Sequence, residues 1–412
     1  MTTPIDYILY ISIFLGLYFQ IFLLLTYLGW REHKDDLPGF SEEQLPGVSI
    51  MVPCWNEATT VQGTIDSLLA SNYPRDRLQI VIIDDGSTDN SWDILKQFNN
   101  HPQIMLLQKE NGGKFTALNY ALEYITNPIV GCLDADSAVD PNAIRYSAHW
   151  FSRDDVYGVV PSMVVQNPQT IMQHMQKVEY EVATYLKNVL HQLEALYVAP
   201  GPLTLFRKEV FDKLGPYVEA HHTEDLEIAL RMQVGDMRLA YSEDSLVYTK
   251  GPRTWKALLK QRIRWTYGFI KNVQDYRRYL FTKEFGDLSL FILPISIITL
   301  FFAVFVFGLM VTTIISGWVQ TVQTLLVTGF QFKQPNFSFD VFDIPSTAVS
   351  WFSFIGIVLL AIALVIGRRI ILKQKEIFTL DILTIIIYPF FSSWWTIRSL
   401  WNAFLSKKGT WR

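Results

Sequence analysis

Long stretches of the chain carry no charged residue, and they constrain its fold more than any other feature. The 24 residues between Asp6 and Arg31 are uncharged, as are Leu288–Phe332, Ile344–Gly367 and the shorter Ile382–Ile397. A helix of about 20 apolar residues crosses the ~30 Å hydrocarbon layer of a bilayer. The sequence therefore predicts one N-terminal membrane span and a membrane region in its last third.

The middle of the chain has the composition of a soluble domain, although the whole sequence is 50% hydrophobic and only 18% charged. We therefore expect an integral membrane protein. Its predicted segments are an N-terminal transmembrane helix at 1–30, a globular domain at 31–250, basic interface helices at 251–286, transmembrane helices at 287–317 and 344–367 joined by an extracytoplasmic loop at 318–343, a third membrane segment at 377–405, and a tail at 406–412.

Basic residues beside the first apolar stretch predict on which side of the membrane the globular domain lies. Arg31 and Lys34 follow that stretch directly, and positive charge favours the cytoplasmic side. The stretch lacks a basic n-region and a small-residue cleavage site, which indicates a retained anchor. The two cysteines, Cys54 and Cys132, suit a reducing compartment. We expect a cytoplasmic domain at the plasma membrane and no nucleic-acid partner, although the net charge of −4 does not by itself bear on nucleic-acid binding.

Four short apolar runs of the globular domain end in polar, small or acidic residues. They lie in VSIMVPCWNE, LQIVIIDDGSTD, IMLLQKENGGK and PIVGCLDADS, and helix-like segments at 60–69 and 91–98 follow the first two. Strands that alternate with helices at this spacing predict βαβ units and a parallel sheet. Ligands of such sheets bind beyond the carboxyl ends of the strands, so a nucleotide is expected there.

Acidic pairs follow two of these predicted strands. Asp134 and Asp136 can reach one hard cation whose shell is completed by phosphate oxygens, although an isolated pair of this kind is most often a solvated surface feature. Asp84 and Asp85 form a second pair, and two acidic strand ends in one sheet are harder to attribute to chance. Lys114 follows two glycines and opens a helical pattern. It would suit a diphosphate or be an ordinary solvated lysine.

Six short motifs follow one another between residues 47 and 268: VPCWNE, DDGSTDNS, NGGKFTALN, DADS, HTEDLEIALRM and QRIRW. Their order resembles that of membrane-embedded family-2 inverting glycosyltransferases, which include the cellulose, chitin, hyaluronan and poly-N-acetylglucosamine synthases. The T-E-D form and the single N-terminal span look most similar to bacterial poly-β-1,6-N-acetylglucosamine synthases. The resemblance implies an α/β GT-A domain, a UDP-sugar donor, Mg²⁺ or Mn²⁺, and inversion at the anomeric carbon.

The resemblance also implies which residues bind the donor. Trp55 would stack on the base, although the family usually has tyrosine there. Glu57 and Asp85 would bind the nucleoside, and Lys114 would counter the charge of the diphosphate. Asp134 and Asp136 would hold the metal ion. The full set of expected donor-binding residues is Pro53, Trp55, Glu57, Asp84, Asp85, Lys114, Asp134 and Asp136.

The segment HTED begins another helical pattern, with Thr223 as its expected cap. An inverting transfer needs one base that takes the proton of the acceptor. The family pattern assigns this role to Asp225, beside Glu224 in the catalytic centre. The residues alone would favour the simpler interpretation, an acid that is stabilised at the start of a helix by the helix dipole.

The segment QRIRW would lie at the membrane interface. By the family pattern, Gln261 and Arg264 face the diphosphate, and Arg264 can stabilise the charge that develops on it. Trp265 would stack on the terminal sugar of the acceptor, and Gly201 and Pro202 would border that acceptor. Most other basic residues nearby would face lipid headgroups.

Two further segments leave alternatives open. The apolar residues Ile171, Met175, Val178, Val182, Tyr185 and Val189 share a helical face, which fits an interface helix or a helix packed on the domain. Near the end, Arg368, Arg369, Lys373 and Lys375 predict a return to the cytoplasm. The last segment could span the membrane, or it could re-enter and lie along the interface, which would keep the tail GTWR cytoplasmic. We favour the second arrangement.

The leading hypothesis is a processive synthase that elongates a β-linked polysaccharide and extrudes it. UDP-GlcNAc is the favoured donor and UDP-glucose a possible one; the partners would be the growing glycan, the bilayer and a possible small membrane accessory subunit. A rival is the transfer of one sugar to a lipid acceptor, as ceramide glucosyltransferases perform. A scaffold or transporter is disfavoured by the complete acidic motifs and by few intramembrane ionisable residues.

Overall fold

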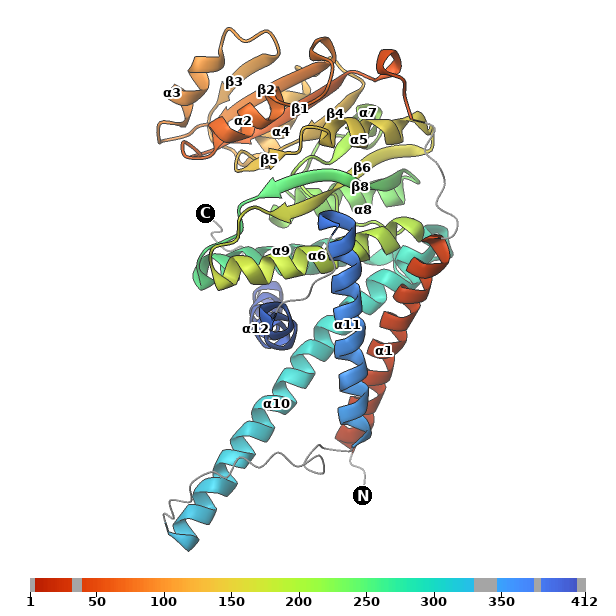
Figure 1. The fold of residues 1–412 in the computed structure, drawn as a ribbon, viewed down its shortest axis with the longest axis vertical. Helices are drawn as coiled ribbons and strands as arrows, with labels where there is room; N and C mark the ends of the chain where they lie inside the picture. Colours follow the sequence, from red (N-terminus) through yellow and green to blue (C-terminus); the bar gives the residue numbers. More distant parts are fainter. Residues whose placement is uncertain (1–3, 32–38, 330–346, 374–378, 406–412) are drawn as a thin grey trace.

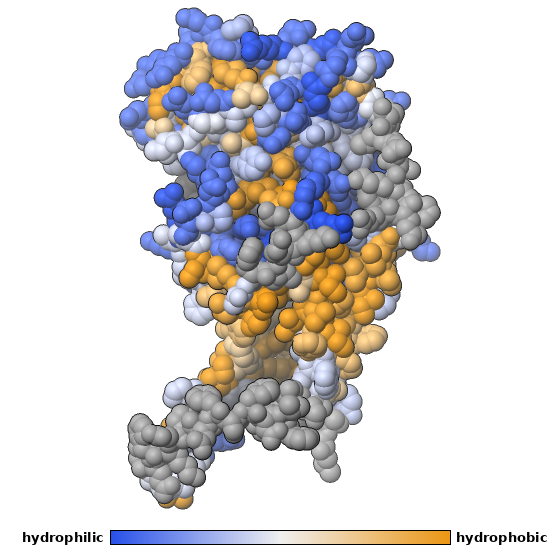
Figure 2. Space-filling model, in the orientation of Figure 1, coloured by the Kyte–Doolittle hydropathy of each residue, from blue (hydrophilic) through white to orange (hydrophobic). Residues whose placement is uncertain are grey.

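The computed structural model describes residues 4–31, 39–329, 347–373 and 379–405. A globular domain built on one eight-stranded sheet stands above a group of long helices (Figure 1). Hydrophilic residues cover most of the globular domain, whereas apolar residues dominate the helices below it (Figure 2). The predicted fold class, an α/β domain joined to apolar membrane-type helices, is confirmed.

The first half of the sheet is parallel and carries the predicted strands. Its strands pair in the order β3-β2-β1-β4. Helices follow the first three strands, as the alternation of strand-like and helix-like segments predicts. The elements are β1 (Val48–Cys54), α2 (Val61–Leu69), β2 (Leu78–Asp85), α3 (Ser91–Leu95), β3 (Ile104–Lys109), α4 (Lys114–Leu122) and β4 (Ile129–Cys132).

The second half of the sheet is mixed, not parallel. Beyond β4 the order continues β7-β6-β8-β5; β7 is antiparallel to both of its neighbours, and β5 is antiparallel to β8. Only residues 133–136 separate β4 from β5, and a parallel crossover needs a dozen or more. The strands of this half are β5 (Ser137–Val139), β6 (Val156–Val165), β7 (Leu205–Arg207) and β8 (Arg238–Thr249).

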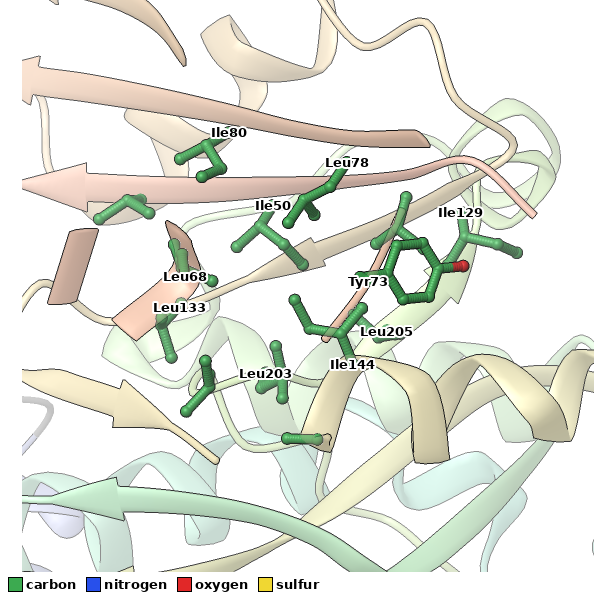
Figure 3. Close-up of a cluster of buried hydrophobic side chains, with 14 of the residues drawn as sticks. Ile50, Leu68, Tyr73, Leu78, Ile80, Ile129, Leu133, Ile144, Leu203 and Leu205 are labelled. Carbon is green, nitrogen blue, oxygen red and sulfur yellow. The ribbon is translucent and has the colours of Figure 1, made fainter. Parts of the chain in front are cut away.

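Buried apolar side chains cover both faces of the sheet. On one face, Ile50 and Ile80 pack with Leu68 of α2 and with Ile144 of α5 (Ala143–His149) (Figure 3). The other face packs against α4 and α8 (Glu224–Val234). Burial of each large apolar side chain stabilises the fold by about 1.5–3 kcal/mol, so the strand ends that carry the motifs rest on a rigid base.

Two long helices, α6 (Ile171–Gln192) and α9 (Trp255–Asp275), lie between the sheet and the membrane-type helices (Figure 1). The apolar stripe predicted for α6 is largely buried by other helices of the chain. Val178 packs with residues of α11 and α12, and Tyr185 and Val189 pack with residues of α1 and α11. Ile171, at the start of the stripe, remains 63% exposed. The helix therefore joins the globular domain to the helices below it.

In the part of the chain that the structure describes, four helices are long and apolar enough to cross a membrane: α1 (Pro4–Arg31), α10 (Leu293–Thr328, preceded by a π-helical turn at Leu288–Ile292), α11 (Ala348–Leu372) and α12 (Thr379–Phe404). Helix α10 continues 11 residues beyond the predicted end at 317, because residues 318–328 contain no charge and no proline. Gly329, at φ +70°, follows its last turn. The rest of the predicted loop and the tail 406–412 lie outside the described residues.

Helix α12 runs in a different direction from the other three. It is seen end-on in Figure 1, below α6 and α9, whereas α1, α10 and α11 run down the page. The Ser399 hydroxyl of α12 donates a hydrogen bond to the carbonyl of Ile263 in α9 (3.3 Å). This packing favours the interfacial alternative for the last segment, which stays a prediction.

A buried ion network joins α6, α11 and α12. Arg368 of α11 is 1% exposed and donates to Glu181 of α6 (2.6 Å) and to Asp381 of α12 (2.7 Å). The other oxygen of Asp381 lies 2.9 Å from Nε2 of His174 in α6. A Cβ on Gly367 would lie 1.7 Å from the Glu181 carbonyl, so α11 and α6 touch backbone to backbone. These carboxylates take Arg368, one of the basic residues predicted to mark the cytoplasmic return, into the interior of the protein.

Candidate active site

The first acidic pair lies at the carboxyl end of β2 and is bonded by the protein itself. The Asp84 and Asp85 side chains are 0% and 2% exposed. The Asp85 carboxylate accepts hydrogen bonds from the backbone N–H groups of Gly112 (3.1 Å) and Gly113 (2.9 Å), and it pairs with Lys109 at 2.8 Å. Asp85 therefore holds the glycine loop that precedes α4.

The loop after β1 carries the residues expected at the nucleoside. Pro53 lies in β1, and Trp55 and Glu57 follow it, all three half-buried. Asn56, at φ +56°, accepts hydrogen bonds through its side-chain oxygen from the backbone N–H of Thr88 (2.8 Å) and from that of the next residue. These bonds bring the VPCWNE and DDGSTD loops side by side, as both family motifs require for one donor site.

Lys114 lies at the first turn of α4 and joins two acidic motifs. Its Nζ atom lies 2.6 Å from Oδ1 of Asp134 and 3.3 Å from Oε1 of Glu224. Burial opposes the charge on Lys114, but these two carboxylates raise its pKa well above the usual value. A Cβ on Gly201 would lie 2.5 Å from the Lys114 Nζ atom. Gly201, expected beside the acceptor, thus leaves room for the Lys114–Asp134 pair.

Asp134 and Asp136 present carboxylates with crowded negative charge. Burial, and then the like charges of Asp134 and Glu57, raise the pKa of Asp136 to about 6. Within the described part of the chain no group of three or more His, Cys, Asp or Glu side chains could hold a metal ion. Two carboxylates fit a hard divalent cation whose other ligands are phosphate oxygens and water. Such a cation would also relieve the repulsion that raises the pKa of Asp136.

Asp225 lies in the first turn of α8, but the helix is not capped as predicted. The Thr223 hydroxyl makes no capping bond; it donates to the Ala220 carbonyl (3.1 Å) and accepts from Asn272 of α9 (2.9 Å). Gly268 of α9 explains this, because a Cβ there would lie 2.3 Å from the Thr223 oxygen. The close approach of α9 turns the hydroxyl away from the helix start.

The environment of Asp225 suits proton transfer. Burial, and then the like charge of Glu224, raise the pKa of Asp225 to about 6, although Lys114 and Arg264 oppose that rise. One Asp225 oxygen accepts the backbone N–H of Leu226 at 2.9 Å. A carboxylate with this pKa is ionised at neutral pH and is a stronger base than an ordinary aspartate.

A cavity of about 640 Å³ joins the second acidic pair to the QRIRW helix and to the membrane-type helices. It lies below the carboxyl ends of the strands, between the sheet and α10 and α12. Ten of the predicted site residues line it: Lys114, Asp134, Asp136, Gly201, Pro202, Glu224, Asp225, Gln261, Arg264 and Trp265. Pro53, Trp55, Glu57, Asp84 and Asp85 do not line it and lie at the neighbouring ends of β1 and β2.

The structure adds cavity residues that the sequence did not single out. Glu179 and Tyr180 of α6, Arg262 of α9 and Tyr388 of α12 all line the cavity. Gln176, one turn before Tyr180, donates to the side chain of Gln261 at 3.1 Å. The polar residues of α6 recur at spacings of three and four, which is a helical face, so this second stripe beside the apolar one was a signal in the sequence.

Comparison with known proteins shows which chains this one is similar to. A model of the Glycosyltransferase like family 2 matches residues 46–268, more than half of the chain. Poly-beta-1,6-N-acetyl-D-glucosamine synthases of Staphylococcus epidermidis are similar: one is 29% identical over 361 residues, 87% of this chain and 82% of the relative. A second, from strain RP62A, is 28% identical over 400 residues, 96% and 92% of the two chains.

Among solved structures, a mannosyltransferase from Pyrobaculum calidifontis in complex with GDP-Man and Mn²⁺ matches with a TM-score of 0.57 and 17% identity, over 97% of this chain and 99% of that one. At this identity the likeness concerns the fold, and it extends to the helices below the globular domain. The family match contains every predicted site residue from Pro53 to Trp265. This chain is therefore a glycosyltransferase that belongs to family 2.

Proposed function

We propose that this protein is an inverting glycosyltransferase that polymerises a β-linked, N-acetylglucosamine-containing polysaccharide from UDP-GlcNAc and moves it across the membrane. One observation carries the proposal: a single cavity connects the metal-binding carboxylates and Asp225 with Trp265 and with residues of α10 and α12. The names of the similar staphylococcal synthases support N-acetylglucosamine as the sugar and a β-1,6 linkage.

The geometry supports a direct displacement. The acceptor hydroxyl oxygen attacks C1 of the donor sugar from the face opposite the diphosphate. Its proton passes to the Asp225 carboxylate, and the electron pair of the broken C1–O bond leaves with UDP. Arg264 and Lys114 stabilise the charge on the leaving diphosphate. A divalent cation, Mg²⁺ or Mn²⁺, would neutralise the same diphosphate when bound to Asp134 and Asp136.

The path of the product follows from the same cavity. Beyond Trp265 the cavity is lined by Ser296 and Thr299 of α10 and by Tyr388 and Trp395 of α12. Hydroxyl groups and aromatic rings suit the hydroxyls and apolar faces of sugar rings. A growing chain that leaves Trp265 would therefore enter between the membrane-type helices.

The proposal includes a cytoplasmic catalytic domain at the plasma membrane and an α12 that lies along the interface. Both native cysteines are buried, so single cysteines introduced at exposed positions report accessibility. With a membrane-impermeant maleimide on intact cells, Val327→Cys in the last turn of α10 is expected to react, whereas Lys96→Cys and Phe404→Cys react only after lysis. Reaction of Phe404→Cys on intact cells would mean that α12 spans the membrane.

The activity is tested with the purified full chain in detergent, radiolabelled UDP-GlcNAc or UDP-glucose, and Mg²⁺ or Mn²⁺. We expect labelled product of high mass from UDP-GlcNAc that β-1,6-N-acetylglucosaminidase degrades. Label confined to lipid-soluble product would support single-sugar transfer to a lipid instead. No product from any donor would contradict enzymatic activity, and the Asp225→Asn protein provides the background.

A further inference from the structure

The indole of Trp265 is covered on one face by an arginine of its own motif. The guanidinium carbon of Arg262 lies 4.3 Å from the centroid of the Trp265 ring. A planar ring has two faces, and Trp265 lines the cavity, so this contact leaves one face for a ligand. A cation over an indole face contributes about 0.5–2 kcal/mol, and more where water is excluded. The side chain of Arg262 is 4% exposed, so water is largely excluded here.

Arg262 is itself held by two other helices. Its Nη2 atom is paired with the Glu179 carboxylate of α6. The Tyr388 hydroxyl of α12 also interacts with this carboxylate, and Arg262 and Tyr388 both favour its charged form against burial. Trp265, Arg262, Glu179 and Tyr388 thus form a continuous chain of contacts across α9, α6 and α12.

The far end of this chain of contacts is well packed. The Tyr388 ring meets the Trp395 ring edge to face, with centroids 5.5 Å apart, and Trp395 is 4% exposed. Trp395 also lies against Trp255 at the start of α9, with centroids 6.3 Å apart. Because both ends are fixed, the plane of the Arg262 guanidinium is fixed, and with it the ring that it covers.

We propose that Arg262 is a positioning residue for the acceptor: locked by Glu179 and Tyr388, its guanidinium holds the Trp265 indole in the orientation that receives the acceptor sugar. The inference rests on the proposed function, because it takes Trp265 as the acceptor platform. It assigns a purpose to Arg262, which lies between Gln261 and Arg264 in QRIRW and is paired with Glu179. It also makes α12 a part of the acceptor site.

The decisive variant is Arg262→Lys, because lysine keeps the charge opposite Glu179 but lacks the planar group that stacks on the indole. With β-1,6-linked N-acetylglucosamine oligosaccharides as acceptors, we expect the acceptor KM to rise roughly 3- to 30-fold. Hydrolysis of UDP-GlcNAc by water needs no platform and should stay within about twofold. Tyr388→Phe, which removes one hydroxyl, should shift the acceptor KM in the same direction and less.

A double-mutant cycle separates positioning from general packing. If Arg262 acts through the indole, Arg262→Lys should have no further effect on the acceptor KM in a Trp265→Ala background. Arg278→Gln is the matched control, because Arg278 lies 4.6 Å over the ring of Tyr279 but outside the cavity. It should leave the acceptor KM and donor hydrolysis unchanged.

The outcomes are distinct. Three results would each overturn the positioning role: an unchanged acceptor KM in Arg262→Lys, an equal loss of donor hydrolysis and elongation in that variant, or additive effects in the double-mutant cycle. In each case, elongation by the wild-type protein would still support the proposed function. Wild-type protein that hydrolyses UDP-GlcNAc but extends no oligosaccharide would overturn the proposed function and this inference together.

Discussion

Two pairs of neighbouring aspartates follow β-strands of one sheet, yet the protein uses them differently. Asp84 and Asp85 are buried, and their oxygens accept hydrogen bonds from backbone and side-chain donors of the adjoining loops. Asp136, by contrast, has burial and two like charges around it, and Asp134 shares Lys114 with Glu224. The hydrogen bonds of the first pair are made within the protein, whereas the second pair carries crowded negative charge that a cationic ligand would neutralise.

This difference sharpens the roles that family resemblance assigns. Asp85 already binds two N–H groups and a lysine, so we propose that it shapes the loop before α4, and its expected contact with the nucleoside stays a prediction. The carboxylates that line the cavity have the opposite property. Crowded like charge at a cleft is typical of groups that bind a cation or transfer a proton.

The largest effect is expected at the cavity, for Asp225→Asn. An amide cannot accept the acceptor proton, so turnover should fall about 100-fold or more. The Kd of UDP-GlcNAc, measured by calorimetry on the same protein, should stay within a few-fold because the donor diphosphate contacts other residues. A parallel collapse of donor binding would show that Asp225 is a donor ligand and that the base lies elsewhere.

Asp136→Asn should weaken donor binding itself. Loss of one of two metal-binding carboxylates is expected to raise the Kd of UDP-GlcNAc in Mn²⁺ by about tenfold or more, while binding in EDTA changes little. Equal Kd values for wild-type protein with Mn²⁺ and with EDTA would remove the metal role from this pair.

The pH dependence follows from the raised pKa of Asp225, about 6. Below that pH the carboxylate is protonated and cannot act as a base, so kcat/KM for the donor should fall, reaching roughly a tenth of its plateau near pH 5. Asp136 titrates in the same range, but its proton competes with the metal ion. Saturating Mn²⁺ should therefore move the fall in kcat/KM that is due to Asp136 to lower pH and leave the fall that is due to Asp225 unchanged. A kcat/KM that stays constant from pH 5 to 8 would contradict the assignment of Asp225 as the base.

The smallest effect on catalysis is expected for Asp85→Asn. The variant loses the pairing with Lys109 and weakens the bonds to the glycine loop, which should cost about 2–3 kcal/mol of stability. Turnover per folded molecule should change less than threefold, and thermal unfolding in detergent measures the stability loss. Asp93→Asn, which removes an exposed pair with Lys96, is the control and should cost almost nothing. If Asp85→Asn raised the Kd of the donor as much as Asp136→Asn does, the two pairs of aspartates would not differ in the way that we describe.

The sequence predicted those parts of the fold whose signal is local. Each of the strands β1 to β4 pairs an apolar run with a polar end, so the predicted segments and the motif positions agree with the structure. The mixed half of the sheet depends on which distant strand β7 joins, and no pattern within Leu205–Arg207 encodes that choice. The prediction that the Thr223 side chain caps α8 was wrong for a similar reason, because the close approach of Gly268, in another helix, turns the Thr223 hydroxyl away from the start of α8.

In the site, too, the residues with a local sequence signal were predicted and those placed by packing were not. Ten predicted residues line one cavity because each belongs to a recognisable motif. Glu179 and Tyr388 were missed because they meet Arg262 only through the packing of α6, α9 and α12. The burial of Arg368 was likewise not predicted, because its neutralising partners, Glu181 and Asp381, are 187 and 13 residues away in the chain.

That last separation has a consequence for how the protein is made. During synthesis Arg368 emerges before Asp381, so its guanidinium lacks the carboxylate of Asp381 until α12 has been made. The charge of Arg368 is therefore neutralised fully only after α12 has followed α11 and the α6 carboxylate has docked, so the packing of α6, α11 and α12 is completed in one late step. A chain that stops after Lys373 should accordingly unfold at a lower temperature in detergent than the full chain, because Arg368 then keeps its pairing with Glu181 but loses that with Asp381.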